Sequence, residues 1–329
     1  MPATLTVDTV HRVFNDGHHN AFTDICRYRD RLYLTFRNCP DGHMLFTTSR
    51  ILVLSSANGV DWEEVLAFSV PDRDVRDPHL LVYRDTLYVY SSTWLVDPTD
   101  PSARDLNDML GHACWTPDGR TWHGPRTMAG TEGHYVWRAA TDGQRAYLCG
   151  RRKRGLAKTH TFEESWTLTE GAMLVGDDGL TWETAGLFQE TYGNETAFLF
   201  EPDGEVLALA RGRHPRPAQL CRSRPPYHEW TRTDLDRDLG GPMLAKWGNR
   251  YLVSGRKGMG TDNPQTALYW LEGDQLHEIA VLPSGGDNSY PGFVALSDTQ
   301  GLLSFYSSHE GSGTSLAPSA IYLAELRVD

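Results

Sequence analysis

The sequence lacks the segments that would attach it to a membrane or send it out of the cell. No apolar run approaches the roughly 20 residues that a membrane-spanning helix needs, so we expect no membrane contact. The first residues, up to His11, show neither the basic head nor the apolar stretch of a secretory signal. We therefore expect a cytoplasmic protein.

Cysteine is scarce, and motifs for metals and cofactors are missing. The 5 cysteines are scattered singly without a Cys-x-x-Cys pair, which argues against a disulfide framework and a structural zinc site. There is no His-x-x-x-His with a Glu, no Asp-x-Asp-x-Asp-Gly loop and no phosphate-binding glycine-rich loop. We therefore expect neither a metal nor a cofactor.

Basic residues are outnumbered, since 43 acidic face 31 basic residues and the formal net charge is -12. Proteins that bind polyanions usually carry the opposite charge, so we expect no nucleic acid partner. The composition, 40% hydrophobic and 22% charged, is typical of a folded protein.

The chain repeats a short turn. Asn58-Gly59, Asp118-Gly119 and Asp178-Gly179 are spaced by 60 residues, and each is followed three positions later by Trp. Asx-Gly between two alternating segments predicts a β-hairpin, because Gly tolerates positive φ and the Asx side chain bonds nearby backbone. A degenerate fourth copy ends at Trp230.

A second series of strand-like segments recurs in step with these turns, from Leu32-Tyr33-Leu34 to Leu302-Leu303-Ser304. Together the two series predict six units of four short antiparallel strands, an all-β six-bladed β-propeller. The last unit lacks a strand, which residues 4–14 would supply and so close the ring. We expect residues 1–329 to form one domain and a monomer, with a short helix over residues 102–110 at most.

The Asx-Gly-x-x-Trp turns resemble the Asp boxes of the sialidase-like six-bladed propellers. The stretch from Gly193 to Arg211 is similar to the sialidase fourth blade, and the segment around Tyr290 is similar to the one that carries the sialidase nucleophile. The resemblance implies that Tyr290 is a nucleophile, that Glu195 is the base activating it, and that Arg211 grips a substrate carboxylate. The Arg-Ile-Pro motif of the first sialidase blade is absent, since His18-His19-Asn20 stands there. We therefore expect a substrate other than sialic acid.

In a propeller, the starts of the innermost strands and the ends of the second strands meet on one rim, so distant residues converge there. Guanidiniums concentrated on that rim indicate a small anionic ligand, a carboxylated sugar or oligosaccharide, although pairing with acids of neighbouring blades would explain each of them equally well. The candidate substrate-binding residues are Arg37, Arg76, Arg138, Arg151, Arg211 and Arg256, with His19, His43, His79 and His134.

These residues favour a glycoside hydrolase that cleaves a terminal anionic sugar through Tyr290 and Glu195. The acid that protonates the leaving group is left open among Asp24, Asp77, Asp41 and His43, and the resemblance favours Asp41 or Asp24.

Two other functions remain open. One is a uronic-acid polysaccharide lyase that uses a Tyr and a His. The other is a sugar-binding propeller without activity, which would stack sugars on the side chains of Trp94, Trp137, Trp247 and Trp270.

Overall fold

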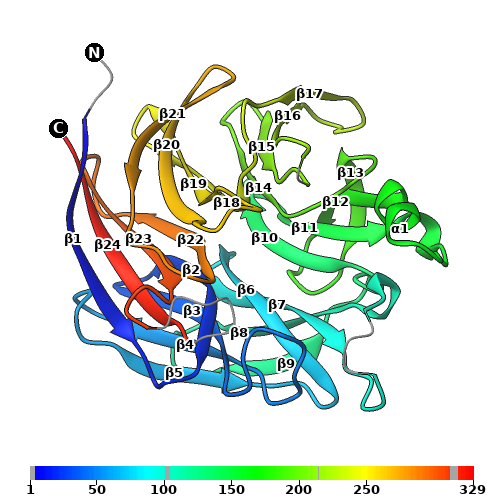
Figure 1. Ribbon diagram of the computed structural model, residues 1–329, viewed down its shortest axis with the longest axis horizontal. Coiled ribbons are helices and arrows are strands. Elements are labelled where there is room, and N and C mark those ends of the chain that lie inside the picture. Colours follow the sequence, from blue (N-terminus) through cyan, green and yellow to red (C-terminus); the bar gives the residue numbers. More distant parts are fainter. Residues whose placement is uncertain (1–3, 101–103, 214, 312–317) are drawn as a thin grey trace.

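Six four-stranded antiparallel sheets surround a central axis in the computed structural model, which describes residues 4–100, 104–213, 215–311 and 318–329 (Figure 1). The sheets are the blades of a six-bladed β-propeller, as the repeats predicted. The innermost strands β2, β6, β10, β14, β18 and β22 contact one another in sequence around the axis.

The first blade, from the innermost strand outward, consists of β2 (His19–Tyr28), β3 (Arg31–Cys39), β4 (Arg50–Ser56) and β5 (Glu63–Phe68). The second consists of β6 (Arg73–Tyr83), β7 (Thr86–Leu95), β8 (Leu110–Thr116) and β9 (His123–Thr127). The third consists of β10 (Tyr135–Thr141), β11 (Ala146–Lys153), β12 (Thr169–Gly176) and β13 (Glu183–Gln189). The next two are β14 (Thr196–Phe200), β15 (Val206–Ala210), β16 (Gln219–Ser223) and β17 (Trp230–Asp234); and β18 (Gly240–Trp247), β19 (Arg250–Lys257), β20 (Gln265–Glu272) and β21 (Gln275–Val281).

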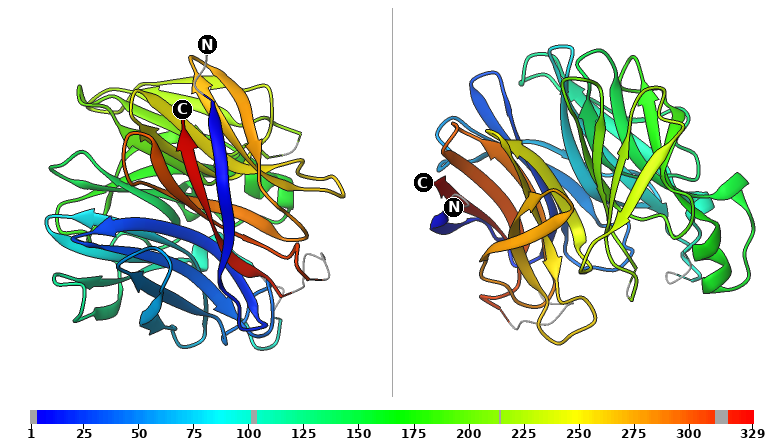
Figure 2. Two further views of the ribbon diagram at one scale, coloured as in Figure 1. Left: turned by 90° about the vertical axis from the view of Figure 1, so that its left-hand side faces the viewer. Right: turned by 90° about the horizontal axis from the view of Figure 1, so that it is seen from above.

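The sixth blade joins the two ends of the chain. It consists of β22 (Asn288–Ala295), β23 (Gln300–Ser307), β24 (Ala320–Val328) and, on the outside, β1 (Leu5–Phe14). Leu5 pairs with Val328 and Phe14 with Ile321, so the N-terminal strand completes the blade as predicted (Figure 2, left). This pairing covers the edge that β24 would otherwise expose.

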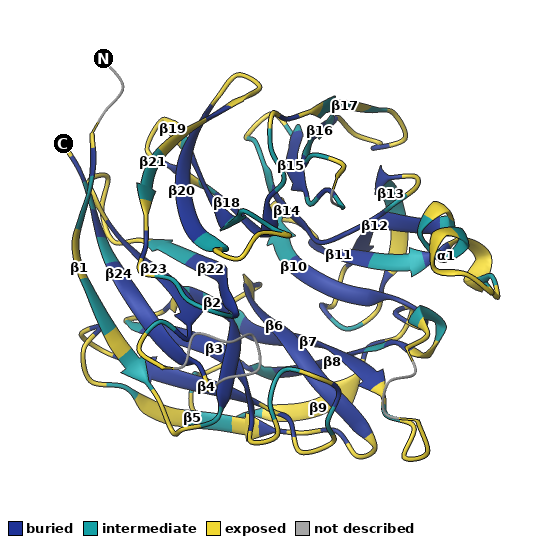
Figure 3. Ribbon diagram, viewed as in Figure 1, coloured by how far each residue is buried: buried dark blue, intermediate teal, exposed yellow. Residues whose placement is uncertain are grey.

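The apolar core lies between neighbouring blades. The middle strands are almost wholly buried, as in β15, whereas the outermost strand β9 is exposed along its length (Figure 3). Where blades 5 and 6 meet, the centroid of the Trp247 ring lies 5.1 Å from that of Phe293 and 6.3 Å from that of Trp270, distances typical of favourable aromatic pairs. In the described part of the chain no helix has the length and apolar character that crossing a bilayer would require.

The predicted turns join the third and fourth strands of the first three blades. In the second blade, Oδ1 of Asp118 accepts hydrogen bonds from the backbone N–H groups of Arg120 (2.8 Å) and Thr121 (2.7 Å). Gly119 has a φ of 76° there, a conformation that favours glycine. The indole of Trp230 donates to the carbonyl of Tyr227 in the degenerate fourth copy (2.9 Å).

Helical structure differs from the sequence expectation. Within residues 102–110 the structure has a 3-10 turn, η1 (Leu106–Asp108), and residues 102 and 103 lie outside the described residues. A second such turn, η2 (Arg154–Leu156), and a helix, α1 (Phe162–Leu168), were not predicted. Seven residues are too few for a periodic pattern, but Thr161 caps α1 by accepting from the backbone N–H of Glu164 (3.1 Å).

We expect the closing blade to support the fold strongly. Leu323 on β24 is 0% exposed, and its replacement in Leu323→Ala removes core contacts and leaves a cavity, at a cost of about 2–5 kcal/mol in the free energy of unfolding. Urea denaturation measures this loss. The control, Val60→Ala, changes a side chain that is 68% exposed and should alter stability by less than about 0.5 kcal/mol. Equal, small effects of both changes would contradict the expectation.

Candidate active site

Bulges in the innermost strands bring polar side chains to the centre of the ring. In five of the six inner strands, two consecutive residues face a single residue of the next strand. The bulged pairs are Phe22–Thr23, Asp77–Pro78, Trp137–Arg138, Gly241–Pro242 and Tyr290–Pro291. Such bulges redirect side chains and tolerate proline, which cannot donate a ladder hydrogen bond.

Three bulged side chains sit on strained backbone. Phe22 has a φ of 62°, and Asp77 and Tyr290 both have a φ of 48°, a region that residues other than glycine rarely occupy and that often marks functional sites. Gly241 has a φ of 55°, and a Cβ there would lie 2.7 Å from the ring of Tyr290. Glycine at this position therefore leaves room for the tyrosine.

Tyr290, Glu195 and Arg211 form one hydrogen-bonded group. The Tyr290 hydroxyl donates to Oε1 of Glu195 (2.9 Å), and Nη1 of Arg211 donates to Oε2 of Glu195 (2.8 Å) and to the Tyr290 oxygen (3.1 Å). The backbone N–H of Gly241 also donates to Glu195 (3.2 Å). The hydrogen bond shows that the Tyr290 and Glu195 side chains are in contact. The two residues are 8% and 7% exposed, so neither is completely shielded from solvent.

The charges around this group keep Glu195 ionised and Tyr290 neutral. Burial acts to raise the pKa of Glu195, but the positive charges of Arg211 and Arg151 outweigh it and lower that pKa. Burial, followed by the negative charge of Glu195, raises the pKa of Tyr290. The phenol therefore holds its proton, with a carboxylate in place to receive it.

Asp77 is a further carboxyl close enough for charge interactions with Glu195 and Tyr290, and it titrates near neutrality. Burial, and after it the charge of Glu195, raises the pKa of Asp77 to about 7. Its Oδ2 accepts a hydrogen bond from the Tyr135 hydroxyl, while its buried Oδ1 has no partner among the described residues. Two neighbouring carboxyls with pKa values pushed apart are typical of acid–base pairs in enzymes.

Most of the candidate arginines are neutralised by acids. Arg37 and Arg76 share Asp74, at 2.5 and 2.6 Å. Arg37 is fully buried and also donates to backbone carbonyls of the first blade, which fits a structural role. Sequence reasoning missed Asp74, although it stands two positions before Arg76.

The remaining arginines divide into paired and unpaired. Arg138 contacts Asp24 (3.1 Å), and Arg256 contacts Asp287 (2.8 Å), an acid that sequence reasoning also missed. Arg211 contacts Glu195 as described. Arg151 donates to the side-chain oxygen of Asn194 (3.0 Å) and has no carboxylate partner among the residues that the structure describes.

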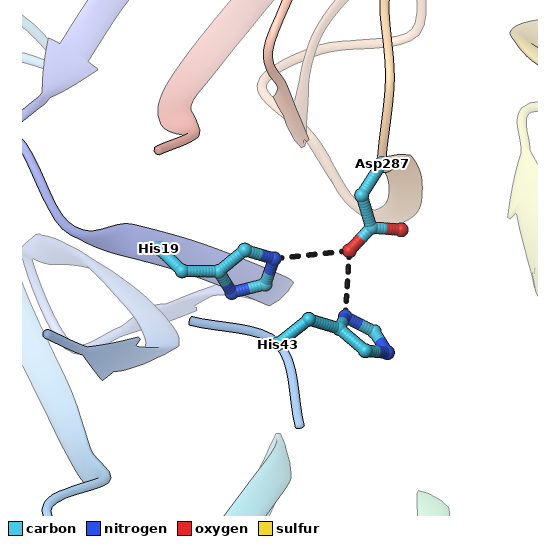
Figure 4. A group of neighbouring side chains, drawn as sticks. All are labelled: His19, His43 and Asp287. Carbon is cyan, nitrogen blue, oxygen red and sulfur yellow. Dashed lines mark hydrogen bonds and ion pairs between the residues drawn. The ribbon is translucent and has the colours of Figure 1, made fainter. Parts of the chain in front are cut away.

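Two histidines converge on one carboxylate oxygen. Nε2 of His19 and Nδ1 of His43 lie 3.0 and 2.7 Å from Oδ2 of Asp287 (Figure 4). The three ligand atoms lie within 4.8 Å of one another, a spacing that a metal ion would tolerate. The other oxygen of Asp287 is held by the Arg256 guanidinium, however, so a cation here would face a positive charge. The group therefore fits a hydrogen-bonded network better than a metal centre.

Other predicted residues lie apart from the Tyr290 group or are fully engaged. Asp24 accepts from Arg138, from His79 (3.3 Å) and from the backbone N–H of Leu80 (3.0 Å), so its oxygens are occupied. Asp41 is exposed and accepts from the Thr48 hydroxyl.

The structure also buries the remaining ring side chains that the sequence offered as ligand contacts. His134 is buried against Arg152, and burial, then that charge, lowers its pKa to about 4. The four tryptophans predicted as stacking platforms, Trp94, Trp137, Trp247 and Trp270, are all buried, which removes that basis for a binding-only propeller.

A pocket of about 350 Å³ adjoins the Tyr290 group between the third and fourth blades. Its lining includes Arg151, Arg211 and Arg213, together with Asn194 and Trp166. A larger cavity of about 660 Å³ lies on the outer strands of blade 4, around Arg224, and contains none of the predicted site residues. The smaller pocket is the one connected to the candidate chemistry, because Arg211 belongs to both.

The fold of this chain is similar to those of several solved structures. A protein of unknown function from Dyadobacter fermentans matches over 100% of both chains with 20% identity and a TM-score of 0.81. The phage phi92 endosialidase matches over 98% of this chain and 69% of its own, with 10% identity and a TM-score of 0.67. The chain has the six-bladed propeller fold of sialidases. Trypanosoma rangeli sialidase in complex with sialic acid matches over 99% of this chain with 11% identity and a TM-score of 0.63, and this chain spans 59% of its length.

At these identities the likeness shows the fold alone. Neither a family model nor a curated protein sequence matches the chain.

The raised pKa of Asp77 predicts a pH-dependent stability. The folded protein binds this proton more tightly than the unfolded chain, so Asp77 lowers stability progressively as pH rises from about 4 to about 7. Asp77→Asn, which cannot ionise, should therefore stabilise the fold relative to wild type at about pH 8, on the order of 2–4 kcal/mol, and much less at about pH 4. Urea denaturation at both pH values measures the difference. Asp41→Asn, on an exposed loop, is the matched control, and a pH-independent effect of Asp77→Asn would contradict the assignment.

Proposed function

We propose that this protein is a glycoside hydrolase that removes a terminal carboxylated sugar, using Tyr290 as nucleophile and Glu195 as its base. The observation that carries the proposal is the hydrogen bond from the Tyr290 hydroxyl to an ionised Glu195 (2.9 Å), with Arg211 bonded to both groups. The sialidase-type fold supports it at the level of architecture.

In the first step, the Tyr290 oxygen attacks the anomeric carbon and gives its proton to Glu195. Arg211 lies 3.1 Å from the phenol oxygen and stabilises the negative charge that develops there. A tyrosine nucleophile suits an anionic sugar, because a neutral phenol brings no second negative charge against a substrate that already carries a carboxylate.

The departing oxygen needs a proton as the glycosidic bond breaks, and Asp77 supplies it. Its pKa of about 7 leaves much of it protonated near neutral pH. For Asp24, burial acts to raise the pKa, but the charge of Arg138 and the hydrogen bond with His79 outweigh it and lower that pKa. Water then attacks the glycosyl–tyrosine bond and transfers a proton to Asp77, while Glu195 returns its proton to Tyr290. The balance is one glycoside and one water converted to a free sugar and an alcohol.

The substrate is expected to be anionic because guanidiniums dominate this part of the rim. Sialic acid itself is not the favoured sugar, since the first-blade stretch His18-His19-Asn20 lacks the arginine that the sialidase resemblance would require there. Uronic acids and other carboxylated sugars are the substrates to test first.

Removing either member of the pair should abolish turnover without abolishing binding. Tyr290→Phe and Glu195→Gln keep the shapes of the side chains, and each should lower kcat by about 10³-fold or more while the KM changes little. Release of the phenol from a panel of aryl glycosides of uronic and sialic acids measures this. Ser297→Ala, in the exposed β22–β23 turn, serves as control. Full activity in both variants would refute the nucleophile assignment, and an unsaturated product formed from uronic-acid oligosaccharides would indicate a lyase instead.

The role given to Asp77 predicts a dependence on the leaving group. Asp77→Asn cannot donate a proton, so it should slow the hydrolysis of alkyl glycosides by about 10²-fold or more and affect an activated nitrophenyl glycoside much less. Steady-state rates on the two substrate types measure the contrast. An equal loss on both substrates would show that Asp77 supports the site without acting as the acid.

A further inference from the structure

The pocket between blades 3 and 4 carries an excess of positive charge on a protein whose net charge is -12. Three guanidiniums line it. Arg211 is balanced by Glu195, but neither Arg151 nor Arg213 has an ion-pair partner within the described ranges. Glu163, the acid whose charge acts on Arg213, is bonded to the Tyr192 hydroxyl (2.5 Å).

Donor atoms of these side chains are left unused. Nε of Arg151, Nε of Arg211 and Nη1 of Arg213 are buried without a hydrogen-bond partner among the described residues. Buried donors are normally satisfied, and an anionic ligand with two oxygens would satisfy such donors bidentately. A bound anion would therefore accept hydrogen bonds from donors that have no partner among the described residues.

Aromatic rings hold the two unpaired guanidiniums in place. The Arg213 guanidinium lies 3.8 Å from the ring centroid of Phe162 and 4.3 Å from that of Trp166. Arg151 lies 4.8 Å from the ring of Tyr135 and 5.5 Å from that of Trp166. Stacking fixes the planar groups while leaving their N–H edges free for a carboxylate. Both Phe162 and Trp166 come from α1, the helix inserted in the third blade.

The other arginines of the rim cannot offer the same site. Arg37 and Arg76 are neutralised by Asp74, Arg138 by Asp24, and Arg256 by Asp287. An anionic group would gain little charge attraction from guanidiniums that already have a buried carboxylate partner. Arg211 is balanced in the same way by Glu195, but it lines the pocket and its Nε has no hydrogen-bond partner among the described residues. The attraction for an anion is therefore concentrated on the side of blades 3 and 4.

We propose that Arg151, Arg211 and Arg213 bind the carboxylate of the sugar, in a pocket beside Trp166. This inference rests on the proposed function and specifies it: the acid group is recognised from blades 3 and 4, and the sugar ring lies between this pocket and Tyr290. Arg211 connects the two, since its Nη1 contacts both Tyr290 and Glu195.

Calorimetric binding tests the pocket independently of turnover. The probes are D-glucuronic acid and N-acetylneuraminic acid, each compared with its uncharged methyl ester. We expect at least one free acid to bind wild type, its ester to bind more weakly by about tenfold or more, and Arg213→Gln to lose affinity for the acid by a similar factor. Arg213→Lys, which keeps the charge but not the planar fork, should fall between the two. Arg224→Gln, at an exposed position on the outer part of blade 4, is the matched control and should bind as wild type does.

The outcomes separate this inference from the proposed function. Equal binding of acid and ester, unchanged binding by Arg213→Gln, or no binding of either acid by wild type would overturn the pocket. Hydrolysis of a carboxylated glycoside with a KM unaltered by Arg213→Gln would also overturn it while leaving the proposed function standing. Binding that depends on Arg213, with no glycoside hydrolysed, would support the pocket and refute the hydrolase.

Discussion

Charge pairing at the centre of the ring governs the rest of the site. Arginines buried in this part of the ring carry a large desolvation cost, which a facing carboxylate and hydrogen-bond acceptors offset. Asp74, Asp24 and Asp287 provide this for Arg37, Arg138 and Arg256. These paired side chains are balanced in charge. Glu195, Tyr290 and Asp77 differ from them, because their protonation states depend on the charges nearby.

Glu195, Tyr290 and Asp77 are the groups on which the proposed chemistry depends. Glu195 is held ionised by its arginine neighbours, and Tyr290 is held neutral by burial and by Glu195. Burial, and after it the negative charge of Glu195, raises the pKa of Asp77 to about 7. The same burial that is costly for structure therefore separates the protonation states of three neighbouring side chains.

The bulges explain how a regular fold produces an irregular site. A strand places alternate side chains on opposite faces of its blade, so an unbroken inner strand would send few of them into the channel. An extra residue in an inner strand changes which side chains face the channel, and Asp77 and Tyr290 both lie in such bulges with a φ of 48°. Proline follows both residues in the sequence, as Asp77-Pro78 and Tyr290-Pro291. A proline within a strand is compatible with a bulge, but the sequence alone does not show that a bulge forms there.

Local rules were sufficient for the architecture. Asx-Gly turns followed by Trp, alternating apolar segments and the unpaired last unit predicted six blades and closure by the N-terminal strand, because hairpins and strand period depend on neighbours in sequence. The same rules could not find Asp74 or Asp287 as partners or the short helix α1, since these depend on tertiary contacts and on a cap too local to show a period. The sequence by itself determined the ring and the residue types at its mouth. The tertiary structure alone decided which guanidiniums are neutralised and which lack a carboxylate partner in the described part of the chain, because that depends on distances between charges carried by different blades.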